Sequence, residues 1–69
     1  MLSVQEYLAA KLHYYQVIRK EQPGMRFGQH FVNSYGWKDL ELFYEDHDAV
    51  AESIILERHV DWAEAQKER

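Results

Sequence analysis

The side chains best suited to acid–base or metal chemistry are four histidines and a larger set of carboxylates. On a helical wheel His59 lies beside Glu52, and a buried pair of this kind is able to tune a proton-transfer group. A histidine at such a boundary position more often only packs its ring, and we favour that interpretation. The other histidines fall on the polar face of a helix or near loop ends: His13, His30 and His47.

Residues 45–48 place three carboxylates and an imidazole in succession. Adjacent side chains rarely converge on one ion, and the chain has neither a His-Glu-x-x-His motif nor a cysteine that would supply a thiolate ligand. The sequence therefore predicts no metal site and no cofactor.

The serines offer no nucleophile in a recognisable setting. Ser3 has a capping position, Ser34 precedes a turn and Ser53 falls within a helix, and none has a Gly-x-Ser-x-Gly context. No glycine-rich loop is present to hold a phosphate. A chain of 69 residues also has little room for a deep pocket. We therefore expect a protein without catalytic residues and without enzymatic activity.

The net charge of −4 is unevenly distributed. Residues 1–37 hold four basic and two acidic side chains, a balance of +2, whereas residues 38–69 hold four and ten, a balance of −6. A nucleic-acid binder needs a basic face, and the basic half is too weak to favour that class. The acidic half fits a basic protein surface, although acidic helical faces are most often only solvated.

The chain shows no secretory signal pattern after Met1 and no apolar run of about 18 residues that would cross a membrane. The absence of cysteine fits a reducing compartment. These features predict a cytoplasmic protein that does not associate with membranes.

Helices are the elements that would position all of these groups. We predict one all-α domain over residues 1–69, with three main helices and one additional short helical turn. Without disulfides or a metal, so short a chain relies on helix packing, on its aromatic residues or on oligomerisation. The expected helices cover residues 3–22, 26–35, 39–44 and 47–66.

The first helix begins with a capping box formed by Ser3 and Glu6 and ends at Pro23 and Gly24. Lys11 lies within its apolar face, either with its stem on the surface and its ammonium in water, or in contact with an acidic group such as one on the last helix of a second copy. The expected face comprises Val4, Leu8, Leu12, Tyr15 and Ile18, with Tyr7 and Tyr14 at its edge.

The middle of the chain, residues 26–46, holds all three phenylalanines and two of the three glycines. Gly28 on an apolar face predicts the close approach of another group, and Gly36 predicts a left-handed helix end. Asp39 is expected to cap the short turn. A strand over residues 40–44 is the alternative, but it would have no partner.

The last helix, capped by Asp46 or Asp48, is apolar on nearly all sides in its first half. Val50 and Ile54 fall outside its two apolar stripes, so they predict either a partner or self-association surface, or simply exposed aliphatic side chains. Trp37 and Tyr44 are amphipathic and lie near turns, as in many protein–protein hot spots, although small aromatic cores have the same composition. The predicted partner-binding residues are Trp37, Tyr44, Glu45, Asp46, Val50 and Ile54.

Residues 26–45 also have the length of a helix-turn-helix, but the second helix is acidic and phosphates would repel it. We keep this class only as the alternative function: a small nucleic-acid-associated regulator with a degenerate helix-turn-helix that uses Arg19, Lys20 and Arg26.

The segment Arg-Phe-Gly-Gln at residues 26–29, Asn33 and Glu-Leu-Phe-Tyr-Glu at residues 41–45 resemble a pattern in small accessory proteins of tailed bacteriophages and prophages. The resemblance covers about 20 residues and brings no catalytic residues. It implies a protein of the bacterial cytoplasm that binds and modulates a host protein. A homodimer is a separate expectation, which comes from the short chain and the apolar last helix.

Overall fold

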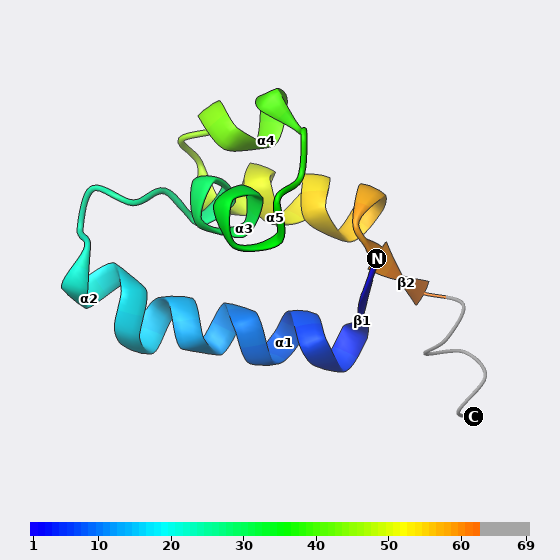
Figure 1. Cartoon of the computed structure of the whole chain (residues 1–69), viewed down its shortest axis with the longest axis horizontal. Helices are drawn as coiled ribbons and strands as arrows, with labels where there is room; N and C mark the ends of the chain where they lie inside the picture. The colour runs from blue at the N-terminus through cyan, green and yellow to red at the C-terminus, as the bar shows by residue number, and fades with distance from the viewer. Residues whose placement is uncertain (63–69) are drawn as a thin grey trace.

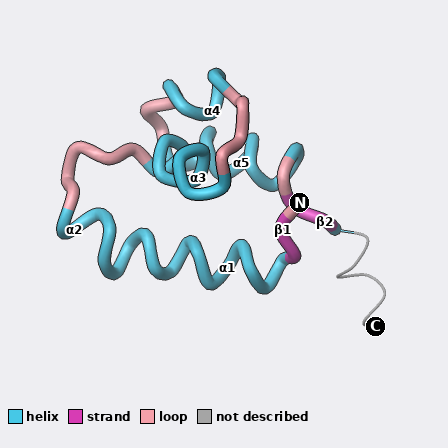
Figure 2. Tube along the Cα trace, viewed as in Figure 1, coloured by secondary structure: helices cyan, strands magenta, loops and turns pink. Residues whose placement is uncertain are grey.

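The computed structural model describes residues 1–62 and consists mainly of helices (Figures 1 and 2). The all-α class predicted from the sequence is confirmed. None of the described helices is both long and apolar enough to cross a bilayer. The elements in chain order are β1 (Leu2–Ser3), α1 (Val4–His13), η1 (Tyr14–Ile18), α2 (Arg19–Glu21), α3 (Phe27–Tyr35), α4 (Leu40–Tyr44), α5 (Asp48–Arg58) and β2 (Val60–Asp61).

The first three helical segments form one continuous helix from Val4 to Glu21. The predicted capping box is present, because Ser3 and Glu6 bond reciprocally to each other's backbone amides at 3.0 Å. The central segment η1 is a π-helix, in which the amide of Arg19 bonds to the carbonyl of Tyr14. This wider turn shifts the register of every later residue relative to an ideal wheel.

The apolar face predicted for this helix is wrong in part. Leu8 and Leu12 are 54% and 57% exposed, whereas Tyr7 and Tyr14 are buried. Both tyrosine rings pack on α3, with Tyr7 against Phe31 and Tyr14 against Phe27. Their hydroxyls also reach acceptors, so the large rings are buried without an unpaired polar group.

The helices are arranged in layers. The long first helix lies on one side of α3 and α5, and α4 lies on the opposite side (Figure 1). The core between them is centred on four fully buried side chains, Phe27, Phe31, Leu42 and Ile55.

Glycine sets two features of this arrangement, as predicted. A Cβ on Gly28 would lie 2.3 Å from the backbone oxygen of Leu42, so α3 and α4 touch where the glycine lacks a side chain. Gly36 ends α3 with a φ of 66°, the left-handed conformation. The following segment then returns to Asp39, whose side chain accepts from the amide of Leu42 and caps α4, also as predicted.

The predicted last helix is too long. Helix α5 ends at Arg58, and Val60 and Asp61 instead form β2, which pairs in parallel with β1; residues 63–66 of the prediction lie outside the described residues. The N-cap is His47, which makes no side-chain cap bond, so neither predicted aspartate caps α5. The register pairs Leu2 with Val60, both buried, because burial of two apolar side chains closes the end of the core.

Candidate partner-binding surface

Helix α4 exposes apolar side chains on its outward side. Leu42 is fully buried under it, but Leu40 and Tyr44, one turn apart, are 71% and 66% exposed. Val50 at the start of the neighbouring helix α5 is 46% exposed. We define the α4 surface as these three side chains with the nearby carboxylates Glu41, Glu45 and Asp46.

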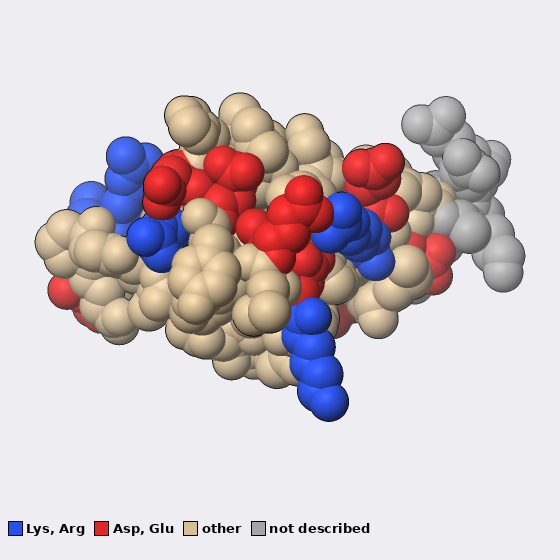
Figure 3. Space-filling model, turned by 90° about the horizontal axis from the view of Figure 1, so that it is seen from above, with Lys and Arg blue, Asp and Glu red and all other residues tan. Residues whose placement is uncertain are grey.

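Acidic side chains gather in the middle of the face that bears α4, with basic side chains on either side of them (Figure 3). Glu41 accepts from Arg58 at 2.6 Å, and Asp46 pairs with Arg26. Glu45 accepts from the amide of His47, and this bond is the main cause that lowers the pKa of Glu45. Glu41 and Asp46 are exposed but paired with arginines, and Glu45 is less exposed, so the rim of the α4 surface combines three carboxylates with two arginines.

The residues predicted for this surface differ in how far their side chains are exposed. Tyr44 and Val50 are exposed, and Glu45 and Asp46 lie beside them. Ile54 is only 8% exposed and belongs to the core, so its inclusion was wrong. The exposed side chain that the prediction missed is Leu40; its spacing of four residues from Tyr44 would have indicated a shared helical face.

Trp37 is half-buried and packs against the core rather than standing exposed on the α4 surface. Its ring stacks on that of His59, with centroids 3.9 Å apart and planes within 7°, and also on Tyr35. His59 Nε2 lies 3.0 Å from Asp39 Oδ2. The favoured interpretation, that His59 packs its ring, agrees with this stacking, and the alternative partner Glu52 is replaced by Asp39 because the end of α5 turns the imidazole toward the α4 cap.

Asp39 contacts three groups at the junction of α4 and α5. Burial raises its pKa, but bonds from His59, from the Leu42 amide and from nearby Arg58 outweigh burial, so the pKa of Asp39 lies below its ordinary value. No hydroxyl group of the described residues bonds to the imidazole. The Asp39–His59 pair therefore holds the start of α4 to the end of α5, a link that the sequence did not predict.

The long first helix, which runs through α1, η1 and α2, is joined to α5 by a polar ladder with two rungs. In the first, Glu52 accepts from the Tyr7 hydroxyl and pairs with Lys11 at 2.6 Å. In the second, the Tyr15 hydroxyl donates to Asp48 at 3.0 Å, and Arg19 lies 3.7 Å from the same carboxylate. The rungs show that α1 and α5 run antiparallel.

The ladder explains the position of Lys11. The cation contacts an acidic group on the last helix, but on the same chain rather than on a second copy. Bonds from Lys11 and then Tyr7 lower the pKa of Glu52. Burial, followed by the bond to Asp48, raises the pKa of Tyr15 to about 12.

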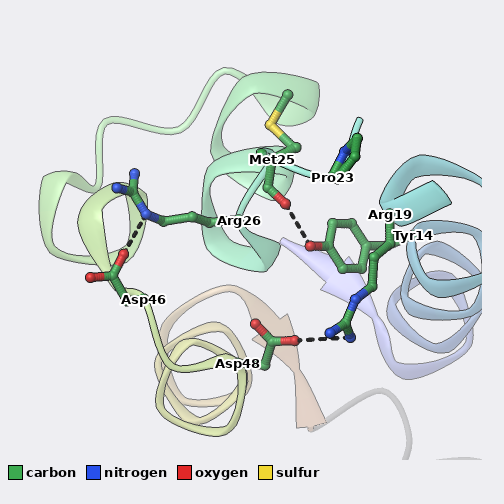
Figure 4. Close-up of a pocket in the computed structure, with 8 residues that line it drawn as sticks. Tyr14, Arg19, Pro23, Met25, Arg26, Asp46 and Asp48 are labelled. Carbon is green, nitrogen blue, oxygen red and sulfur yellow. Dashed lines mark hydrogen bonds and ion pairs between the residues drawn. The ribbon is translucent and has the colours of Figure 1, made fainter. Parts of the chain in front are cut away.

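A small hollow of about 190 Å³ lies where the turn after α2 meets the segment before α5 (Figure 4). Its walls carry two ion pairs, Arg26 with Asp46 and Arg19 with Asp48, and Tyr14 donates to the Met25 carbonyl. Two of the three basic residues needed by a nucleic-acid regulator are thus already paired with carboxylates. The second helix of the suggested helix-turn-helix, α4, has only five residues.

A second, shallower hollow separates α1 from α3 and includes both His13 and His30. His30 lies within α3 rather than near a loop end, and burial followed by the nearby His13 lowers its pKa. Over residues 1–62, no group of three or more acidic or histidine side chains is arranged to hold a metal ion.

Comparisons with protein-family models, with curated proteins and with solved structures found no match. The geometry of the surface is therefore the basis on which its role is argued.

Proposed function

We propose that this chain is a small non-enzymatic protein that binds another protein through the α4 surface. The observation that carries the proposal is the pair Leu40 and Tyr44, two large side chains on one face of a helix, both about two-thirds exposed. Apolar anchors spaced by one helical turn are the usual means by which a helix occupies a partner's groove. A tyrosine anchor loses little conformational entropy on binding, which suits it to a hot spot.

The support beneath these anchors is rigid. Helix α4 is capped by Asp39, touches Gly28 through its own backbone and buries Leu42. A surface held in this way loses little freedom when a partner docks. The three carboxylates of the rim outnumber the two arginines paired with them, which favours a partner that has an apolar groove with lysine or arginine side chains around it, and whose association slows as salt rises.

The resemblance to bacteriophage and prophage accessory proteins supplies the context of the proposal. In that context the chain acts in the bacterial cytoplasm, and its partner is a host protein that it occludes or modulates. Trp37 contributes indirectly, because its ring stacks on His59, which contacts the α4 cap residue Asp39.

The test compares the natural chain with a Leu40→Ala/Tyr44→Ala variant in pull-downs from bacterial lysate, followed by affinity measurements on the recovered partner. We expect the variant to bind at least about 30-fold more weakly, as for the loss of two anchors. A Gln5→Ala/Gln16→Ala variant, altered at exposed positions of the first helix, should bind as the natural chain does. Equal recovery of every partner by all three proteins would contradict the proposal.

A further inference from the structure

A second exposed face lies on the side of the molecule opposite α4. The first helix turns Tyr7, Lys11 and Tyr15 toward α5 through the ladder, which leaves Leu8 and Leu12 on the solvent side. By the same periodicity, α5 presents the exposed Ala49 and Ser53 beside the ladder, together with Leu56, which is half-buried against the core. We call this two-helix area, with Leu8 and Leu12 as its centre, the outer face.

We propose that the outer face binds a second copy of this chain, with the two first helices antiparallel across a two-fold axis. In such a dimer each Leu8 lies near the partner copy's Leu12, so both leucine pairs are removed from water. Leu8 and Leu12 are each more than half-exposed in the single chain, so this apolar area is available for burial.

The charges at the two ends of the outer face identify a second copy as the occupant. Lys20 lies near the end where α5 begins, whereas Glu57 lies near the opposite end, because α1 and α5 run antiparallel. Both residues are exposed, and neither has an ion-pair partner within residues 1–62. A two-fold axis superposes opposite ends of the face, so Lys20 of each copy approaches Glu57 of the other.

The composition of the chain gives an independent reason for this association. It has 69 residues and no cysteine, and residues 1–62 contain no candidate metal cluster. A domain of this size gains stability from burial between copies where disulfides and metals are missing. The proposal does not depend on α4, which stays exposed in the dimer because it lies on the other side of the molecule.

The test measures the mass of the purified chain by sedimentation equilibrium over a wide concentration range. We expect a dimer, with a dissociation constant raised at least about tenfold in a Leu8→Ser/Leu12→Ser variant whose helical circular dichroism is unchanged. The Leu40→Ser/Tyr44→Ser variant should dimerise as the natural chain does. A strict monomer at millimolar concentration, or a dimer lost only in the α4 variant, would overturn the proposal.

The orientation of the two copies has its own test. Lys20→Glu should weaken the dimer by placing two carboxylates together, and the double exchange Lys20→Glu/Glu57→Lys should restore it. Weakening by both single and double variants, with intact folding, would contradict the antiparallel arrangement. These measurements use the chain alone, so their outcome is separate from that of the partner-binding experiment.

Discussion

Gly28 is the position at which the chain tolerates a side chain least. A Cβ there would meet the carbonyl oxygen of Leu42 at 2.3 Å, and a backbone group inside a helix cannot rotate away. A side chain added at position 28 would therefore force α3 and α4 apart, and this movement would expose the buried Leu42.

We predict that Gly28→Ala lowers the free energy of unfolding by about 2 to 3 kcal/mol, despite the better helix propensity of alanine. Urea unfolding followed by circular dichroism measures the change. Gly24→Ala is the matched control, because nothing lies within 4 Å of its Cβ and its φ is not positive. A control loss as large as that of Gly28→Ala would show that the effect does not come from the contact with Leu42.

At the scale of elements, the junction between α4 and α5 depends on the charge of Asp39. Its side chain caps α4 and contacts His59 and Arg58 at the end of α5. Because the folded-state pKa of Asp39 is below its unfolded value of 3.8, the carboxylate stabilises the fold above that pH. This stabilisation is lost as the pH falls through the folded-state pKa.

We predict that Asp39→Asn costs about 1 to 2 kcal/mol at pH 7, since asparagine retains the capping geometry but loses the charge toward His59 and Arg58. The difference between the two proteins should shrink as the pH falls below about 4. Denaturant unfolding at pH 7 and pH 3 measures both values. A constant difference across this range would mean that the ionised carboxylate is not what holds the junction.

The sequence sufficed for elements whose signals are local. The capping box at Ser3, the breaks after α2 and α3, the Asp39 cap and the tight contact at Gly28 all follow from neighbouring residues, and the structure shows each of them. The features that the sequence did not predict depend on residues that are distant along the chain. The end of α5 at Arg58 reflects the pairing of Val60 with Leu2, which no window of sequence contains.

The candidate site was predictable to a similar degree. The acidic run and the exposed Tyr44 could be read from residue type and from proximity to a turn. The burial of Ile54 could not, because its helix is apolar on several sides and the packing of the other helices decides which side is covered. Leu8 and Leu12 were misplaced for the opposite reason: hydropathy ranks leucine above tyrosine, whereas the hydroxyls of Tyr7 and Tyr14 find partners across the core.

At the scale of the whole molecule, the β1–β2 pair closes the fold. The amide of Leu2 donates to the carbonyl of His59 at 2.8 Å, and the Leu2 side chain is 6% exposed. This contact fixes the start of the long helix to the end of α5 and covers one end of the core.

We predict that Leu2→Ala destabilises the protein by about 2 kcal/mol or more, the usual cost of truncating a buried leucine. Met1→Ala should be nearly neutral, since Met1 is 83% exposed. Thermal unfolding at fixed protein concentration compares the two. Equal melting temperatures for Leu2→Ala and the natural chain would show that β1 does not contribute to the core.

The same closure has a consequence for the order of events during synthesis. The first helix leaves the ribosome first, but Tyr7 meets its partner Glu52 only 45 positions later, and Leu2 meets Val60 later still. Most of the stability of a helix in a protein comes from tertiary packing, so the first helix remains partly formed until α5 has been made. Folding of this domain therefore completes after translation of its last elements, because its earliest segment depends on its latest.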